Sequence, residues 1–523
     1  MSFCVRLSMG AYIGAVLLTA GGCGSTQKTG PRELVILIEA SVEDLDPRFA
    51  ASGYAIKISR LVAAPLVSLN TRDMRPKMEL AESVSLPDAL TYEVTLRPTA
   101  RFSDGAPVTA ADVKATLDSI RSRGSLSPHR RSFARIAKIE VLSARRVRFT
   151  LRAAHAPFLS DLDMGILKAS QVRASARGLR GRIPDWKLIG AGPLRITKRT
   201  VSRIELAPNP HYFGARPKLE RYVVKTVEDD NSRLLALVAG GGDVTQNTVA
   251  PLLLPALERS PKLRVLHGPS LMTTYMAVNL RDRKLKDPRV RLAIALAIDR
   301  KRIIAAKFRG RALLASSILT PQHWAHNDRV RPLPFDPARA RRLLDQAGFP
   351  RPSGGGPRFA LTYKTSSNRF RLAIARVIAR QLGRVGIQVQ VRSYEWGVFF
   401  ADLKQGSYQL ATLQMTELAE PDYHYYFFHS SKRATAARPN AGGNRFGYAS
   451  AEVDRLLEQG RTATTRAARR LHYRAVQRLL NRDLPIIPLW HEDNLAVLRR
   501  EVRGYHLLPN ARFDPLLEVV KKR

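Results

Sequence analysis

The stretch that decides the fold is Lys77–Val113, which reads KMELAESVSLPDALTYEVTLRPTARFSDGAPVTAADV. Its middle alternates apolar and polar residues, with Tyr92, Val94 and Leu96 on one face. This period of two is typical of a strand that is buried on one side only. The stretch therefore predicts a half-buried strand near its centre.

The end of the same stretch predicts a turn followed by a helix. Asp104 and Gly105 form a typical turn pair. Thr109 then precedes Asp112 by three residues, which is the spacing of a capping box at the start of a helix. A strand, a turn and a capped helix are thus expected in this order.

Helix and strand signals alternate over much of the remaining chain. Acid–proline pairs, which favour helix starts, occur at Asp287-Pro288 and Asp336-Pro337. Two further strands are predicted by the alternating residues Val147, Phe149 and Leu151 and by Ile387, Val389 and Val391. A helix is predicted by the spacing of Ile374, Val377, Ile378 and Leu382. Gly348 and Gly386 are expected to end helices. Because helix followed by strand recurs, the sequence predicts an α/β fold.

The composition is that of a large globular chain with an unusual charge. Its 523 residues are 45% hydrophobic and carry a formal net charge of +42. The arginines are spread over the whole length, without zinc-finger spacing or an aromatic–basic RNA motif, so nucleic acid is not expected as a partner. A solvated basic surface is the main interpretation of the charge, and attraction to an anionic membrane or cell wall is the second.

No catalytic or metal-binding motif stands out. The chain has neither a G-x-S-x-G elbow nor an H-E-x-x-H pair, and Gly240-Gly241-Gly242 lacks the Lys-Ser/Thr of a Walker motif. His424 and His429 are five residues apart, which does not place them on one helical face. The sequence therefore predicts no enzyme, no metal site and no cofactor.

The N-terminus predicts export. Arg6 precedes a short uncharged apolar run, which reads as a secretory signal because a membrane span needs about 20 apolar residues. Cys23 follows this run, and the only other cysteine, Cys4, lies in the segment that would be removed. Because this arrangement resembles a bacterial lipoprotein signal, we expect removal of residues 1–22, lipidation of Cys23 and a flexible tether over 23–30. An ordinary secretory signal and a buried N-terminal helix are the alternatives.

Five blocks of the chain, taken in order, resemble the family 5 solute-binding proteins, the peptide-type receptors of ABC importers. The stretch quoted first carries the family pattern F-x-D-G-x-P-[VL]-T-A-x-D-V between Phe102 and Val113. The second block covers Gly190–Val244, beginning with GAGPLRI and ending with GGGDV. The other three blocks are DPRVRLAIALAIDR at Asp287–Arg300, FDPARARRLLDQAGF at Phe335–Phe349 and LPIIPLWH at Leu484–His491.

This resemblance implies a two-lobed fold of the periplasmic-binding-protein type (type II, cluster C) with an extra strand-rich subdomain. By analogy, lobe I comprises 31–75, 185–272 and 489–523, the extra subdomain comprises 76–184, and lobe II comprises 273–488. Members enclose a ligand between the lobes, and closure about the hinge signals to the transporter.

The resemblance also implies an anchor for a ligand amine. In oligopeptide-type members an acidic side chain beyond a strand holds the amine, and the corresponding stretch here is Gln414–Ser430. Glu417 is the nearest acid to the expected position. An amine anchor and a solvated loop carboxylate are the two interpretations of Glu417.

Aromatic side chains and one amide complete the candidate site. Trp396 matches a tryptophan that is common in the family and is expected either to stack on the ligand or to pack in the core. Asn279 matches a family asparagine at the start of the second lobe, where it is expected to fix the hinge strand or to contact the ligand. The remaining aromatic candidates are Tyr394, Tyr423 and Tyr425.

The predicted function is that of a lipid-anchored, monomeric receptor in the periplasm or at the cell surface. It would capture dipeptides or oligopeptides and deliver them to the permease and ATPase of an ABC importer. Two alternatives stay open. One is the same fold binding a non-peptide solute such as a nickel chelate, haem, an opine or an oligosaccharide, and the other is a surface sensor or adhesin.

Overall fold

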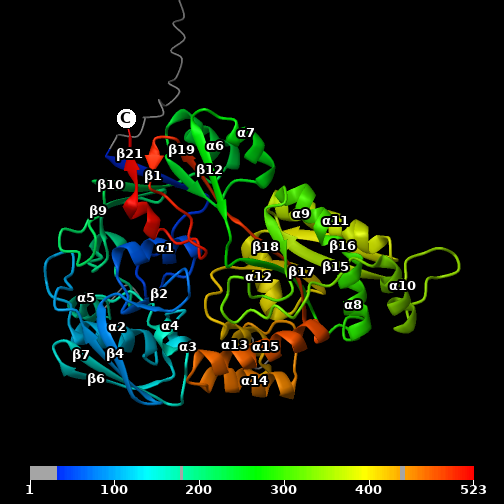
Figure 1. Cartoon of the computed structure of the whole chain (residues 1–523), viewed down its shortest axis with the longest axis horizontal. Helices are drawn as coiled ribbons and strands as arrows, with labels where there is room; N and C mark the ends of the chain where they lie inside the picture. The colour runs from blue at the N-terminus through cyan, green and yellow to red at the C-terminus, as the bar shows by residue number, and fades with distance from the viewer. Residues whose placement is uncertain (1–31, 177–180, 436–441, 523) are drawn as a thin grey trace, which may run out of the picture.

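The computed structural model describes residues 32–176, 181–435 and 442–522. Two lobes lie side by side, each built around its own large sheet (Figure 1). We call the body with the seven-stranded sheet the first lobe and the body with the six-stranded sheet the second lobe. A smaller four-stranded sheet lies at the far end of the first lobe, in the blue and cyan part of Figure 1.

The seven-stranded sheet has the order β12-β19-β11-β1-β10-β9-β8. Its central strand β1 reads ELVILI and is buried at every position after the first, because helices cover the sheet and neighbours flank it on both edges. The strands are β1 (Glu33–Ile38), β8 (Leu194–Arg199), β9 (Arg203–Pro208), β10 (Arg221–Thr226), β11 (Val244–Gln246), β12 (Leu263–Gly268) and β19 (Asn494–Arg499), and the helices are α1 (Gly53–Val62), α6 (Asp230–Ala239) and α7 (Leu254–Glu258).

The four-stranded sheet confirms the pattern in the opening stretch. Tyr92, Val94 and Leu96 are buried on one face of β5, and Thr109 and Asp112 form the expected capping box at the start of α2. The sheet has the order β4-β5-β7-β6. Its elements are β4 (Ala81–Asp88), β5 (Thr91–Leu96), β6 (Ile136–Ser143), β7 (Arg146–Leu151), α2 (Ala110–Arg121), α3 (Arg130–Phe133), α4 (Phe158–Asp161) and α5 (Ala169–Ala176).

The six-stranded sheet of the second lobe has the order β14-β18-β13-β17-β15-β16. The strands are β13 (Thr273–Val278), β14 (Ala312–Leu314), β15 (Phe359–Ser366), β16 (Ile387–Tyr394), β17 (Leu410–Met415) and β18 (Ile486–Glu492). The helices are α8 (Pro288–Ala297), α9 (Arg300–Phe308), α10 (Pro337–Gln346), α11 (Arg369–Gly383), α12 (Trp396–Gln405), α13 (Tyr423–Phe428), α14 (Ala451–Thr462) and α15 (Arg466–Asp483).

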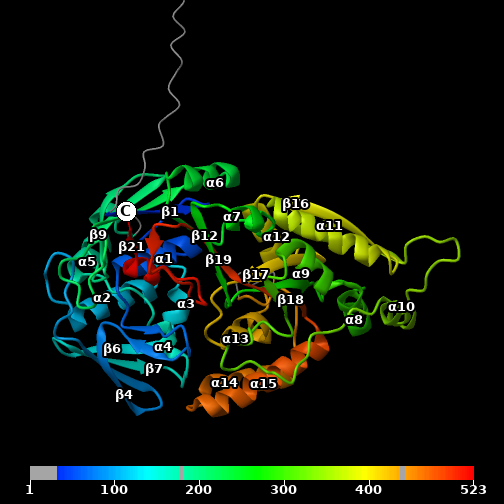
Figure 2. The ribbon, with the colours of Figure 1, turned by 45° about the horizontal axis from the view of Figure 1, so that its top comes forward.

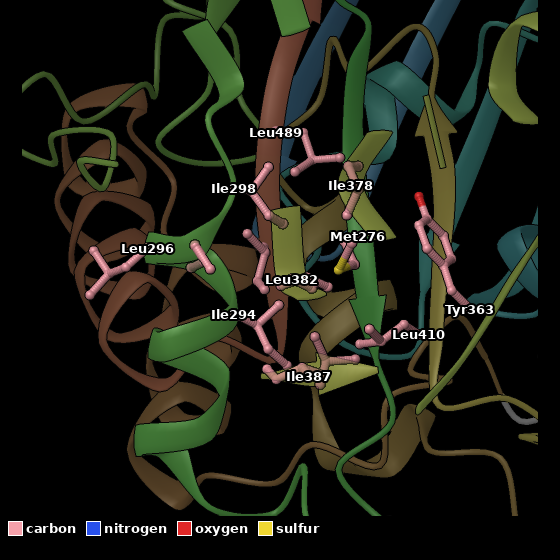
Figure 3. Close-up of a cluster of buried hydrophobic side chains, with 14 of the residues drawn as sticks. Met276, Ile294, Leu296, Ile298, Tyr363, Ile378, Leu382, Ile387, Leu410 and Leu489 are labelled. Carbon is pink, nitrogen blue, oxygen red and sulfur yellow. The ribbon is translucent and has the colours of Figure 1, made fainter. Parts of the chain in front are cut away.

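The core of the second lobe lies between this sheet and its helices (Figure 3). Met276, Leu410 and Leu489 from three neighbouring strands meet Ile294 of α8 and Ile378 of α11. The predicted helix starts are confirmed, because the side chains of Asp287 and Asp336 accept backbone N–H groups in the first turns of α8 and α10. The helix pattern around Ile378 is confirmed as well, although α11 ends three residues earlier than Gly386, which instead forms the turn into β16 with φ 90°.

Two connections join the lobes. The chain passes from β12 to β13, and it returns from β18 to β19. Strand β18 stays in the six-stranded sheet as far as Glu492, so the boundary expected at residue 489 falls inside a strand. The boundary expected at residue 76 likewise falls within a two-stranded ribbon of β2 (Val67–Leu69) and β3 (Pro76–Met78).

Short elements complete the described chain. They are β20 (Val502–Arg503), β21 (Val520–Lys521) and the 3-10 turns at Asp185–Lys187, Pro251–Leu253, Ser430–Lys432 and Asp514–Glu518.

Candidate functional site

A cavity of about 980 Å³ lies between the two lobes. Tilting the molecule shows α3 and α4 of the first lobe facing α13 and α14 of the second (Figure 2). The cavity wall mixes charged and aromatic side chains. The first lobe contributes Arg60, Arg135, Asp161, Asp163 and Arg512, and the second contributes Glu417, Asp422, Tyr423, Tyr425 and Arg461.

Two arginines and two carboxylates form an ion cluster on one wall of the cavity. Arg60 donates to Asp163 over 2.7 Å through Nη2 and to Glu417 Oε1 over 3.4 Å through Nη1. Arg512 also pairs with Asp163, and its Nε lies 3.8 Å from Glu417 Oε1. Glu417 lines the cavity, and no hydrogen bond to its second oxygen is found in the described part of the chain.

Glu417 reaches this position through an unusual backbone conformation. Its φ is 53°, in the left-handed region that disfavours residues with a Cβ atom. It lies two residues after the end of β17 and precedes α13. Local backbone strain of this kind persists only where the surrounding structure holds it, and it is commonly found at binding sites.

A second ion pair orders the opposite wall. Arg461 donates to both oxygens of Asp422, over 3.0 Å through Nε and 2.6 Å through Nη2. The guanidinium carbon of Arg461 lies 3.4 Å from the centre of the Tyr425 ring, and the hydroxyl of Tyr473 donates to Asp422 over 3.2 Å. These contacts fix the position of Tyr425 in the cavity wall.

Asp161 is a carboxylate of the cavity wall that has a histidine and an arginine beside it. His155 Nε2 lies 3.1 Å and Arg135 Nε 3.7 Å from its Oδ2. Burial raises the pKa of Asp161 to about 6, although the Arg135 and Arg461 guanidinium groups oppose the shift. Burial, assisted by Arg135, lowers the pKa of His155 to about 2, so this imidazole stays neutral.

The lobes touch one another around the cavity. The backbone N–H of Ala156 in the first lobe donates to the carbonyl of Arg461 over 2.8 Å, and Ser160 Oγ donates to Glu420 over 3.2 Å. Together with the contact between Arg60 and Glu417, these bonds hold the two walls against each other. The structure therefore has the two lobes in contact with each other around the cavity.

The structure brings together three of the predicted site residues. Glu417, Tyr423 and Tyr425 all line the cavity. Sequence reasoning missed Arg60 and Arg512, the partners of Glu417, because they come from distant segments and carry no local motif. The only signal in the sequence was the general excess of arginine.

The other three candidates lie outside the cavity wall. Trp396 is 55% exposed and stacks on Phe400 with ring centres 5.3 Å apart, so it neither packs in the core nor lines the cavity itself. Tyr394 ends β16 and has Lys364 Nζ 5.3 Å from its ring centre. The buried amide of Asn279 donates to the carbonyls of Gly406 and Tyr408 and holds the loop before β17, away from the connecting strands.

The remaining expectations concern the N-terminus, the two histidines and metal binding. Cys23, with the predicted signal and tether, lies outside the described residues. In the described ranges, His424 bonds to the carbonyl of Pro421 and His429 to Glu458, and no group of side chains suited to a metal ion is found. None of the described helices is both long enough and apolar enough to cross a membrane.

Comparison with known proteins decides the family. The pattern that describes bacterial extracellular solute-binding proteins, family 5 Middle, matches residues 75–436. The chain belongs to family 5. The match includes the opening stretch of the sequence, the cavity-lining loop around Glu417 and helix α13.

Two named relatives are similar to this chain over nearly their whole length. Di/tripeptide-binding protein 2 of Pseudomonas aeruginosa is 28% identical, with 96% of this chain and 97% of the relative covered. A glutathione-binding protein of Escherichia coli is 25% identical over 92% of this chain and 93% of its own. The family is therefore supported by sequence across both lobes.

Solved structures show the same two-lobed fold. A periplasmic binding protein from Helicobacter pylori, in complex with the peptide STSA, has a TM-score of 0.81 and 25% identity, covering 95% of this chain and 99% of its own. An oligopeptide-binding protein from Bacillus subtilis, in complex with a nonapeptide, has a TM-score of 0.81 and 22% identity, and the match covers 95% of this chain and 100% of that protein. The α/β class and the two-lobed architecture predicted from the sequence are thus confirmed.

Proposed function

We propose that the protein is the substrate-binding receptor of an ABC importer and captures short peptides between its two lobes. The observation that carries this proposal is the mixed-charge, aromatic cavity between the lobes, in a chain similar over almost its full length to a di/tripeptide-binding protein. Captured peptides would then pass to a membrane permease. Closure would involve movement about the two connections between the lobes.

The cavity supplies the groups that a peptide needs. A peptide is a zwitterion, and enclosing it removes water from both charges, so each must meet an opposite charge. Glu417 Oε2, to which no described residue donates a hydrogen bond, is suited to accept one from the amine. Tyr423 and Tyr425 offer aromatic surface for ligand side chains, while arginines in the wall can meet carboxylates.

The amine contact is tested by Glu417→Gln, which keeps the size of the side chain and removes its charge. We expect the variant to bind a tripeptide mixture about tenfold to a hundredfold more weakly, because one charge-assisted hydrogen bond is worth about 1.5–3 kcal/mol. Calorimetric titration of wild type and variant measures the difference. The same mixture with acetylated amines should bind the wild type weakly and should not distinguish the two proteins.

A matched control is Glu452→Gln, since Glu452 is an exposed acid of α14 outside the cavity. Its affinity for the tripeptide mixture should equal that of the wild type. If wild-type protein binds neither mixture, the peptide receptor proposal fails. If it binds both mixtures equally, Glu417 is not the amine contact, and a peptide would be held by other groups.

We also infer that the protein is exported and anchored through a lipid on Cys23. The basic start, the short apolar run and the polar tether around this cysteine support the inference. Metabolic labelling with a radioactive fatty acid should label the wild type and leave Cys23→Ala unlabelled. Equal labelling of both proteins, or labelling of neither, would contradict the lipid anchor.

A further inference from the structure

The carboxylates in the cavity wall already have cationic partners. Five line the cavity, and each lies within ion-pair distance of an arginine. The pairs are Asp161 with Arg135, Asp163 with Arg60 and Arg512, Glu417 with Arg60, Glu420 with Arg469, and Asp422 with Arg461. The protein therefore neutralises its own negative charges in this wall.

Three cations of the second lobe lack such partners. Lys404, Lys432 and Arg445 line the same cavity and form no ion pair with any described residue. The segments outside the described ranges contain no aspartate or glutamate, so no side-chain carboxylate from them can supply one. The positive charge of these three groups is thus left uncompensated by acidic side chains.

All three cations lie beside aromatic rings of the cavity wall, and we call this set the cationic face. Arg445 and Lys404 lie 4.6 and 5.0 Å from the centre of the Phe400 ring. Lys432 lies 5.3 Å from the centre of the Tyr425 ring. Aromatic rings hold cations in place by their negative faces but do not neutralise the charge.

Lys432 and Arg445 of the cationic face are half-buried, which makes their uncompensated charge unfavourable, whereas Lys404 is exposed. The Nε–H of Arg445 is buried and has no hydrogen-bond partner among the described residues. Burial lowers the pKa of Lys432, and the neighbouring Arg461 and Arg135 lower it further. Since Arg135 belongs to the first lobe, an anion here would meet positive charge from both sides of the cavity.

We propose that this receptor selects acidic peptides. The cationic face of Lys404, Lys432 and Arg445 would bind the side-chain carboxylate of an acidic residue, in addition to the terminal carboxylate that every peptide carries. The proposal rests on the proposed peptide receptor function and adds a charge class to it. It follows from complementarity, because a ligand with net negative charge would neutralise the cationic face while a basic ligand would add to its repulsion.

The proposal is tested with three tripeptides that differ only at the central residue: Ala-Glu-Ala, Ala-Gln-Ala and Ala-Lys-Ala. We expect the wild type to bind the glutamate peptide at least about tenfold more tightly than the glutamine peptide, and the lysine peptide most weakly, because a single charge-assisted contact gives that ratio. Calorimetry at low ionic strength and again at high ionic strength measures this preference, which salt should reduce.

The double variant Lys432→Met, Arg445→Met should lose the preference for the glutamate peptide while binding the glutamine peptide as the wild type does. The control variant Lys301→Met, Arg341→Met removes two exposed cations of α9 and α10 and should keep the preference. Binding of all three peptides with equal affinity by the wild type would overturn the proposal and leave the receptor function intact. Binding of none of them would count against the receptor function itself.

Discussion

Replacing Trp490 by alanine is expected to lower the free energy of unfolding of the second lobe by about 3–5 kcal/mol, the range for truncating a buried tryptophan. Trp490 lies on β18 and is completely buried. Its ring packs on Phe308 with centres 5.2 Å apart, and its Nε1–H donates to Glu492 over 3.2 Å. Alanine would leave a cavity beside the strand that leads to the first lobe and would remove this donor.

The matched control is Trp396→Ala, because Trp396 is 55% exposed and lies on the surface of the same lobe. Its loss should change the free energy of unfolding by no more than about 0.5 kcal/mol. Urea unfolding followed by far-ultraviolet circular dichroism compares both variants with the wild type. Equal midpoints for Trp490→Ala and Trp396→Ala would show that the burial of Trp490 contributes little.

The second large effect is expected from Asp46→Asn in the first lobe. Asp46 and Arg48 form a fully buried pair, with Arg48 Nη2 at 2.6 Å and Nε at 3.0 Å from the carboxylate. The same carboxylate accepts the backbone N–H of Ile183 over 3.0 Å. Because asparagine leaves the guanidinium buried without a counter-charge, the free energy of unfolding should fall by about 3–5 kcal/mol.

Ligand binding should weaken in the same variant, since Pro47 lies between the two paired residues and lines the cavity. Asp73→Asn is the control, because Asp73 is exposed and its ion pair with Arg75 is exposed too, with 3.6 Å between Arg75 Nε and Asp73 Oδ2. An exposed pair of this kind contributes about 0–1 kcal/mol. Thermal unfolding and peptide titration compare Asp46→Asn with Asp73→Asn. Similar losses of stability and of peptide affinity in the two variants would contradict the role of the buried pair.

Local elements could be predicted from the sequence because their signals are short in range. The alternation in β5 and the cap of α2 depend on neighbours within a few residues, and both were confirmed. Strand β16 shows where such a signal weakens. Ile387 is buried, whereas Val389 and Val391 are only half-buried, because β16 is the edge strand of its sheet and has a neighbour on one side only.

The charged partners in the cavity could not be predicted in this way. Arg60 and Glu417 are separated by 357 positions in the chain, and their contact depends on how two lobes meet. Arg512 joins them from a third segment near the C-terminus. The cationic face could not be predicted from the sequence either. In a chain of net charge +42, no local pattern distinguishes Lys432 or Arg445 from the many solvated cations.

The two connections between the lobes also bear on how such a molecule could be rebuilt. The chain leaves the first lobe after Gly268 and returns at Asn494, and these residues lie directly opposite each other on β12 and β19. The buried cores on the two sides of this junction share no residue. The second lobe is therefore an insertion between two neighbouring strands of the first-lobe sheet. A short hairpin turn between those two residues would close this sheet without the second lobe.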